Sequence, residues 1–244
     1  MWKNEKYAQM NTNSNSYTLV YAAALVVVVA FLLAFVSRSL KPMQDANVAL
    51  DKKKQILAAL NIRHLADEEV GAKYSEVVLA DAVIDVSGNT TAQGAQGGEE
   101  EGFALGSSDY KEGRLALYVC NVDGATKYVI PLYGMGLWGS ISGYLSVDED
   151  RNTVFGAYFS HESETAGLGA EIKDNETWQK QFAGKKIFSG DGDDIALCVV
   201  KAVNKTDEQT QCDAVTGATL TCNGVTDMLR GCLTSYKAFL TENN

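Results

Sequence analysis

Three threonines near the C-terminal end of the chain are spaced so that they could hold a phosphate group. Thr216, Thr219 and Thr221 surround Gly217 and Ala218, between a strand-like segment and the last expected helix. Small residues let the backbone approach a bulky ligand closely, and the start of a helix offers free N–H groups and a positive dipole end. The segment is therefore a candidate phosphate site. Threonine and glycine before a helix are also typical of an ordinary N-cap loop, so the residue types alone leave both interpretations open.

Two other polar clusters are weaker candidates for chemistry. His161, Glu162 and Glu164 have the side chains of a metal site or an acid–base pair, but polar residues in a glycine-rich loop are more often solvated. The acidic cluster at 191–194 lacks the spaced ligands and distal glutamate of a calcium loop, so we expect a solvated turn. We predict no metal site and no catalytic acid or base.

The cysteines do not indicate a metal cluster. No two of them form a CxxC pair, and His64 and His161 are far apart in the sequence. An odd number of cysteines argues against a complete disulfide framework, so buried free thiols are expected, with one bridge left open as the alternative. The five are Cys120, Cys198, Cys212, Cys222 and Cys232.

Length and charge restrict the class of protein. The 244 residues suffice for one membrane anchor and one soluble domain. With 21 basic and 31 acidic residues, the formal net charge is -10. No stripe of Lys and Arg with interleaved aromatic residues is present, so nucleic acid is not an expected partner.

The N-terminal part of the chain contains one expected membrane span. From Tyr17 to Val36 every residue except Thr18 is apolar or aromatic, and a helix needs ~20 such residues to cross a bilayer. A cleaved signal peptide would have an apolar region of about 7 to 15 residues and a small-residue cleavage site. The run here is longer, and Arg38 and Lys41 follow it. We therefore predict a retained transmembrane helix at 17–36, after an N-terminal tail at 1–16.

The rest of the chain divides into a stalk and a domain. Residues 37–60 are expected to form an amphipathic stalk helix, and residues 61–244 one soluble domain. Within that domain, residues 87–102 contain no apolar side chain other than alanine, so they cannot bury a core face. We expect this stretch to be a flexible surface insertion.

The domain is expected to be α+β. Short β-rich runs separated by Gly, Asp and Asn turns predict an antiparallel sheet, and helices are expected around 173–182, with Trp178 inward, and from about 223 to 240. Strands and helices do not alternate regularly, which argues against a doubly wound fold. The expected strands lie at 115–120, 128–130, 141–147, 153–159 and 195–203.

The threonine segment resembles a known motif. Thr216 to Thr221, preceded by Asp213, resembles the flavinylation motif of FMN-binding subunits from sodium-translocating NADH:quinone reductases and related Rnf complexes. Position 216 holds threonine where serine is commoner, which keeps the hydroxyl. The resemblance favours the NqrC family of the sodium pump over the Rnf counterpart. It extends over most of the chain, including residues 40–47, 50–52, 133–139 and 161–172.

The resemblance implies that FMN is attached covalently, through its phosphate, to Thr219. A threonine hydroxyl is a weak nucleophile, and the sequence offers no Ser-His-Asp or Cys-His arrangement to activate it. A separate flavin transferase is therefore an expected partner.

The same resemblance implies a set of flavin contacts. Leu137 and Trp138 would wall the flavin ring, although a turn that buries one tryptophan explains them equally well. The expected FMN-binding residues are Thr219 with Thr216, Gly217, Ala218, Leu220, Thr221, Leu137, Trp138, Gly139, Glu164, Thr165, Gly167 and Leu168.

The implied function is electron transfer within a larger complex. Electrons from NADH, oxidised on another subunit, would pass through this FMN toward quinone, with sodium transport coupled elsewhere. The chain has no NADH-binding fingerprint and one expected membrane helix, so it would be one subunit among others of a membrane redox complex. The resemblance places it in the bacterial inner membrane with its domain in the periplasm. The count of basic residues around the helix would instead keep the domain cytoplasmic.

Two alternatives remain from the sequence. One is the corresponding FMN subunit of an Rnf complex, which exchanges electrons between ferredoxin and NAD. The other is a single-pass extracytoplasmic binding module without a redox role, which would need only the anchor and the β-rich domain.

Overall fold

The computed structural model describes residues 14–190 and 192–242. The chain forms two compact units, Met1–Ala49 and Leu50–Asn244, which are described separately. Residues 1–13 of the predicted tail and Asp191 of the predicted acidic turn lie outside the described residues. The division of the chain into tail, anchor, stalk and domain stays a prediction.

Helix α1 runs from Asn15 to Ala59, so the predicted anchor and the predicted stalk form one continuous helix. Its large apolar side chains between Leu19 and Val36 are exposed within the chain itself. This part of α1 is long and apolar enough to cross a membrane once, as predicted. The end of α1 belongs to the second unit, where Ile56 and Leu57 are buried.

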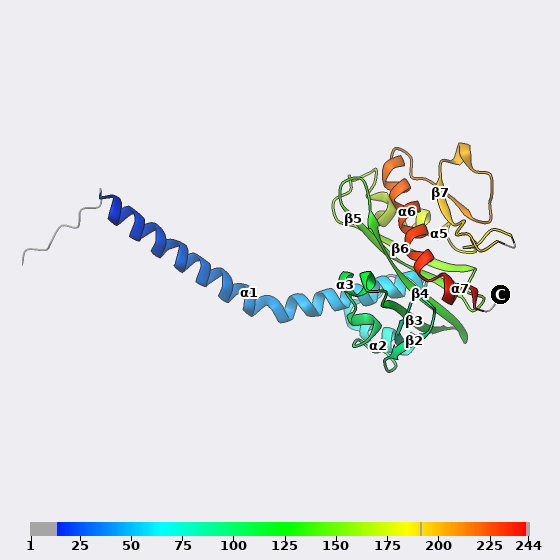
Figure 1. Ribbon diagram of the computed structural model, residues 1–244, viewed down its shortest axis with the longest axis horizontal. Helices are drawn as coiled ribbons and strands as arrows, with labels where there is room; N and C mark the ends of the chain where they lie inside the picture. Colours follow the sequence, from blue (N-terminus) through cyan, green and yellow to red (C-terminus); the bar gives the residue numbers. More distant parts are fainter. Residues whose placement is uncertain (1–13, 191, 243–244) are drawn as a thin grey trace, which may run out of the picture. The chain divides into compact units, whose positions relative to one another are not determined.

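The second unit is built on a six-stranded antiparallel sheet with the strand order β2-β1-β3-β4-β5-β6 (Figure 1). The longest pairing joins β4 to β5, from Lys127 opposite Asp148 to Met135 opposite Ser140. That hairpin therefore ends in a tight turn at 136–139. The strands are β1 Val78–Ile84, β2 Thr90–Gln93, β3 Leu115–Val122, β4 Ala125–Met135, β5 Ser140–Asp148 and β6 Val154–His161.

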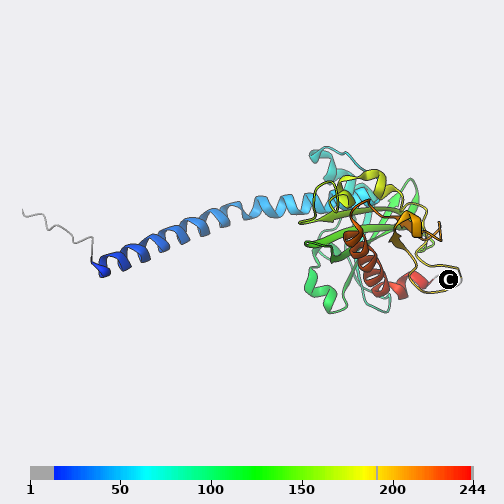
Figure 2. The same cartoon turned by 90° about the horizontal axis from the view of Figure 1, so that it is seen from above.

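One face of the sheet is covered by α6, Thr219–Ser235 (Figures 1 and 2). Val225, Met228 and Leu229 of this helix are buried in the main core with strand residues such as Leu132 and Leu145. Alternate residues of a strand point to opposite faces, which explains why every second strand residue joins this core.

The opposite face packs against the end of α1 and against α2, Asp67–Val77. Ser146 of β5 donates a hydrogen bond of 2.6 Å to the carbonyl of Ala59, the last residue of α1. Tyr118 and Tyr144, on neighbouring parts of this face, meet edge to face with ring centroids 6.2 Å apart. The sheet is therefore buried on both sides over its centre.

The remaining elements differ from the sequence prediction in three places. The segment expected as an antiparallel strand at 195–203 pairs in parallel with β8 in a separate two-stranded sheet. The helix expected at 173–182 is two short helices, and the last helix begins earlier than expected, at Thr219. These elements are η1 Gly102–Ala104, α3 Ser107–Lys111, α4 Glu171–Asp174, α5 Glu176–Lys180, β7 Cys198–Val200, η2 Ala202–Asn204, β8 Gln211–Asp213 and α7 Lys237–Thr241.

The surface insertion predicted at 87–102 contains the edge strand β2, which the sequence analysis did not anticipate. Its side chains are mostly exposed, so the lack of apolar residues does not prevent pairing, which needs only the main chain. The end of the insertion is held by Asp81, whose buried carboxylate accepts hydrogen bonds from the backbone N–H groups of Glu101 and Phe103. The absence of a hydrophobic pattern therefore did not exclude regular structure.

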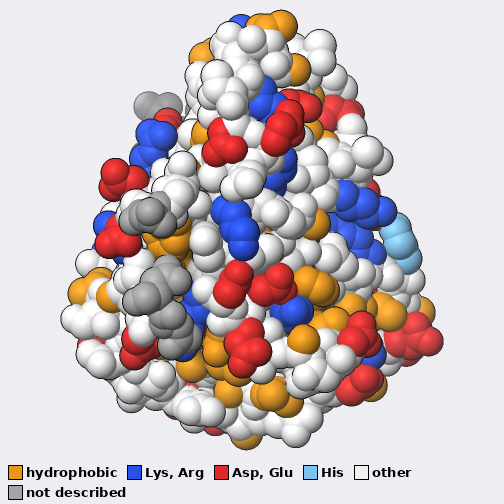
Figure 3. All heavy atoms as spheres, turned by 90° about the vertical axis from the view of Figure 1, so that its right-hand side faces the viewer, with side chains coloured by type: hydrophobic (Ala, Val, Ile, Leu, Met, Phe, Trp, Pro, Cys, Tyr) orange, Lys and Arg blue, Asp and Glu red, His pale blue; other side chains and the backbone are white. Residues whose placement is uncertain are grey.

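Charges of both signs are interspersed on the surface of this unit. Figure 3 shows Lys, Arg, Asp and Glu side chains next to one another on the face that it presents. Pairs of 2.7 Å and 2.8 Å join Lys127 to Asp148 and Arg151 to Glu242. The carboxylate of each pair remains accessible to water, so these pairs contribute little to stability.

Candidate functional site

The turn between β4 and β5 presents two apolar side chains to solvent. It is closed by a 2.8 Å hydrogen bond from the N–H of Gly136 to the carbonyl of Gly139. Trp138 at its tip is 66% exposed, and Leu137 is also exposed. The alternative that this turn buries a tryptophan is therefore wrong, because burial would be the expected state of so large an apolar side chain without a ligand or partner.

Glu164 ties this turn to the start of α6. One carboxylate oxygen accepts a 2.8 Å hydrogen bond from the N–H of Trp138, and the other accepts a 2.6 Å bond from the hydroxyl of Thr221. Glu164 is only 8% exposed, so the sequence-based expectation of a solvated glutamate was wrong. The sequence could not show this, because Thr221 lies 57 residues further along the chain.

The charge state of Glu164 follows from these contacts. Its burial by itself raises the pKa of the carboxyl group, but the hydrogen bonds from Thr221 and from the turn outweigh burial and hold the pKa below its ordinary value. The group is therefore a carboxylate at neutral pH. His161 does not compete for it as a metal ligand would, since its Nδ1 accepts a 3.2 Å hydrogen bond from the N–H of Glu164.

Two glycines make room for this carboxylate. A Cβ atom on Gly136 would lie 2.5 Å from Oε1 of Glu164, and one on Gly169 would lie 2.4 Å from Oε2. Both distances are shorter than any real contact of this kind, so a side chain at either position would displace Glu164. Glycine is therefore required at both positions for the turn and α6 to meet.

The loop after β6 brings a third apolar side chain to the same place. Leu168 is exposed, and its Cδ2 lies 2.8 Å from where a Cβ atom on Gly217 would stand. Gly167 and Gly217 both have positive φ, 73° and 81°, a conformation that glycine adopts without strain. This close approach places the loop containing Thr165 directly against the threonine segment.

The threonine segment itself is the first turn of α6 and the loop before it. Thr219 is the first residue of the helix, and Ala218 is its N-cap residue, with no side-chain capping hydrogen bond. The alternative of an ordinary threonine N-cap is thus not what the segment forms. Thr219 is partly exposed, whereas Thr221 is buried and its hydroxyl is used by Glu164.

Exposed apolar side chains from all three segments surround Thr219. They are Leu137, Trp138, Leu168 and Leu220. Most other large apolar side chains of this unit are buried, and such a cluster at the surface marks a ligand or partner site. A flat aromatic ligand attached at Thr219 would fit against it.

A small cavity beside Thr219 was not foreseen from the sequence. It has a volume of about 220 Å³, and its polar lining includes Lys201, Asn204 and Asn223. Lys201 and Asn204 lie just after the short strand β7. The sequence analysis treated this stretch as part of a longer strand and gave its polar residues no role.

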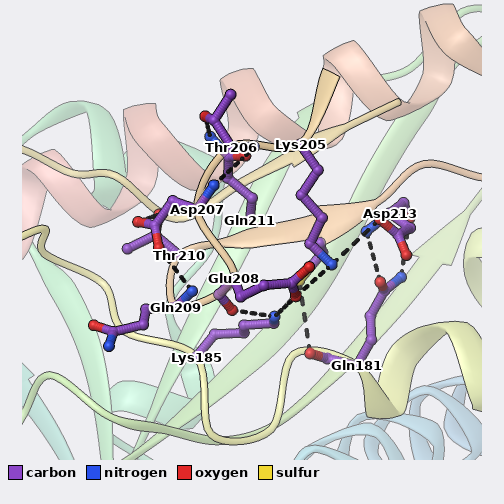
Figure 4. A network of polar contacts seen from close by, with 11 residues as sticks. Gln181, Lys185, Lys205, Thr206, Asp207, Glu208, Gln209, Thr210, Gln211 and Asp213 are labelled. Atoms are coloured by element: carbon purple, nitrogen blue, oxygen red, sulfur yellow. Dashed lines mark hydrogen bonds and ion pairs between the residues drawn. The ribbon is translucent and has the colours of Figure 1, made fainter. Parts of the chain in front are cut away.

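A network of polar side chains holds the start of the threonine loop (Figure 4). Trp178 Nε1 donates a 2.7 Å hydrogen bond to the carbonyl of Asp213, the last residue of β8. Gln181 bonds both the N–H and the carbonyl of the same residue, at 2.6 and 3.0 Å. Lys205 pairs with its carboxylate at 3.3 Å.

Comparison with known proteins identifies the family. Residues 136–234 match the FMN-binding domain family. The NqrC protein of Haemophilus ducreyi, from its Na⁺-translocating NADH-quinone reductase, is 34% identical over 233 residues, covering 89% of this chain and 89% of that protein. The chain belongs to the NqrC family of Na⁺-translocating NADH-quinone reductases. The counterpart from Pseudomonas aeruginosa, 30% identical, covers 95% of this chain and 97% of its own.

Solved structures of two similar proteins have the same fold. The crystal structure of NqrC from Parabacteroides distasonis is 37% identical, with a TM-score of 0.76 over 84% of this chain and 98% of that chain. NqrC of Shewanella oneidensis, at 23% identity and a TM-score of 0.67 over 81% of this chain and 98% of that one, supports the fold alone. The predicted α+β fold and the predicted resemblance to the sodium-pump protein, rather than to the Rnf protein, are confirmed.

The matched FMN-binding domain contains the site described above. It begins at the β4–β5 turn and ends within α6, so it includes Trp138, Glu164, Leu168 and Thr219. The fold brings all the sequence-predicted residues into three adjoining segments. Their individual contacts with FMN remain a prediction.

Proposed function

We propose that this chain carries FMN covalently on Thr219, through a phosphoester, and passes electrons within a Na⁺-translocating NADH-quinone reductase. The observation that supports the proposal most strongly is the setting of Thr219. It is a partly exposed hydroxyl at a helix N-terminus, with exposed Trp138, Leu137, Leu168 and Leu220 around it. Membership of the family and the FMN-binding domain give this setting its ligand.

The phosphate end of FMN would lie at the start of α6. The free N–H groups of the first turn and the helix dipole favour an anion there. Lys201, Asn204 and Asn223 line the adjoining cavity and would supply a positive charge and hydrogen-bond donors. Thr216 and Gly217, both exposed, would complete the phosphate side of the site with Ala218 behind them.

The ring end would lie against the apolar side chains. Trp138 and Leu168 come from different loops, and the bonds of Glu164 and the close approach at Gly217 fix both loops relative to Thr219. Gly139, Thr165 and Gly167 would contact the ligand from the same two loops. Thr221 and Glu164, in contrast, would act by holding these loops and not by touching the ligand.

FMN when bound supplies the redox chemistry, so this chain needs no catalytic acid or base of its own. Its side chains would bind and orient the ring and limit access of water to one side. Electrons that originate from NADH on another subunit would pass through the site toward quinone. The reductase is a multi-subunit complex, and the other subunits are the proposed partners.

Attachment of the cofactor requires a second protein. Thr219 Oγ1 would form a new bond to the flavin phosphate, while the phosphoanhydride of a flavin dinucleotide breaks and the nucleoside monophosphate leaves. The hydroxyl proton would go to a base of the flavin transferase, because no base in the described part of the chain bonds Thr219.

We further propose that the anchor holds the domain on the periplasmic side of the bacterial inner membrane. A covalent link then has a clear benefit, because the periplasm offers no free FMN to replace a lost cofactor. The charge count around α1 points the other way, so an accessibility test on an engineered cysteine in the domain of intact cells is the direct check.

In-gel flavin fluorescence of the denatured full chain tests the proposal. The chain made together with a flavin transferase should fluoresce, and Thr219→Ala should not. Thr234→Ala is the matched control, since it removes an exposed hydroxyl near the other end of the same helix and should keep the fluorescence. A dark wild-type band would reject the proposal and favour the binding module without a redox role.

A further inference from the structure

The residue that begins the threonine loop is held unusually completely. Asp213 uses its N–H and its carbonyl in three hydrogen bonds to the side chains of Trp178 and Gln181, at 2.6, 2.7 and 3.0 Å. Trp178 lies in α5 and Gln181 directly follows it. Both are far from Asp213 in the sequence, so these bonds fix the end of β8 to the body of the domain.

The carboxylate of Asp213 is held as well (Figure 4). Lys205 pairs with it at 3.3 Å and with Glu208 at 2.9 Å. Lys185 joins the same network from the other side, through the backbone carbonyl of Glu208 at 2.5 Å, and forms no ion pair with Asp213 among the residues that the structure describes. The side chains of both lysines are 14% exposed.

The loop beyond Asp213 is anchored at its base and free at its tip. The N–H of Ala214 donates to the carbonyl of Val200 at 2.8 Å, and the N–H of Val215 donates to the sulfur of Cys222 at 3.3 Å. Thr216 and Gly217 at the tip are exposed. An incoming protein would meet a loop whose position is set before contact.

We propose that Trp178, Gln181 and Lys205 are positioning residues for the modification of Thr219, acting through Asp213. The inference rests on the proposed function. Binding costs free energy whenever a mobile loop must be ordered in the complex. A loop that is already ordered avoids this cost, so the network lowers the KM of the flavin transferase for this chain.

The predicted effect is on recognition and not on the transfer step. The step itself forms the bond from Thr219 Oγ1 to phosphorus and breaks the phosphoanhydride of the flavin dinucleotide. The three positioning residues bond the base of the loop and not Thr219, so kcat should stay near its wild-type value. Loosening Asp213 should raise KM about fivefold, the effect of losing about 1 kcal/mol of hydrogen bonding.

Two variants and a matched control test this inference. Trp178→Phe removes the Nε1 donor and keeps an aromatic ring against Phe159 and Phe182. Lys205→Met removes the pair with the carboxylate. Lys185→Met is the control, because it removes an equally buried lysine of the same network that does not pair with Asp213.

The measurement is transferase kinetics on the full chain in detergent, with a flavin dinucleotide as donor, below the melting temperature of every variant. We expect a raised KM and an unchanged kcat for Trp178→Phe and Lys205→Met, wild-type values for Lys185→Met, and recovery of KM in Lys205→Arg. Wild-type KM in both variants, or an equal rise in Lys185→Met, overturns the inference. Failure of the wild-type chain to accept flavin would instead overturn the proposed function.

Discussion

At the scale of single residues, the site depends on the carboxylate of Glu164. It bonds the turn that carries Trp138 and the helix that carries Thr219. Neither partner is near it in the sequence, so local sequence reasoning placed it in a solvated loop. The threonine motif, in contrast, is contiguous, and its position at the start of a helix was predictable from its own residues.

Glu164→Gln should destabilise the domain by about 1.5 kcal/mol, because hydrogen bonds to a charged acceptor are stronger than those to a neutral one. Urea unfolding at pH 7 measures this change. Glu162→Gln is the control, since Glu162 is an exposed neighbour with little expected effect. Equal stability of the two variants would show that the carboxylate does not hold the site together.

The pH dependence of the same pair has a defined sign. A lowered pKa in the folded state means that Glu164 contributes stability above its ordinary pKa of 4.5, and loses it as the pH falls through the folded value. The difference between wild type and Glu164→Gln should therefore shrink below about pH 4.5. A difference that stays constant into acid would contradict the assignment of a stabilising carboxylate.

At the scale of elements, the approach of α6 to β4 sets the distance between Thr219 and the turn. A Cβ atom on Gly224 would lie 2.3 Å from the carbonyl oxygen of Met135, whereas one on Gly231 of the same helix would meet nothing within 4 Å. The two glycines therefore separate packing from helix propensity.

Gly224→Ala should destabilise the domain by roughly 1 to 3 kcal/mol, since the backbone of β4 cannot easily move. Gly231→Ala should stabilise it by up to about 1 kcal/mol, because alanine is the better helix former. Thermal unfolding of the two variants compares them directly. Stabilisation by both substitutions would mean that α6 is not packed as closely as described.

Elements with their own periodic pattern were predictable, and elements that depend on distant partners were not. The apolar run of α1, the central strands and the amphipathic α6 were all predicted, because each pattern lies within one segment. The parallel pairing of β7 with β8 was not, since two short strands of three residues carry too little pattern to show their direction. Strand β2 was missed because it pairs through its main chain with exposed polar side chains.

At the scale of the whole molecule, the buried thiols and phenols predict sensitivity to alkali. Burial raises the pKa of Cys212 from 9.0 to about 12 and also raises the pKa values of Cys120, Tyr118 and Tyr144. The unfolded chain would ionise these groups first, so stability should fall as the pH rises above about 9. Lys52 opposes this trend, because burial lowers its pKa to about 8, but it is a single group.

Urea unfolding at pH 7.5 and pH 10 tests this expectation. The folded domain should be less stable at the higher pH, and Cys212→Ala should reduce the loss. Equal or greater stability at pH 10 would show that these groups are not buried in the way described.

One covalent bond, between Thr219 and the phosphate of FMN, decides whether the chain is the flavoprotein proposed here. Peptide mass spectrometry on the chain purified from native membranes tests it most directly. We predict that the peptide containing Thr219 carries the mass of a phosphoester-linked FMN, and that fragmentation places it on this residue. An unmodified peptide, or an adduct on Thr216, would contradict the proposed function.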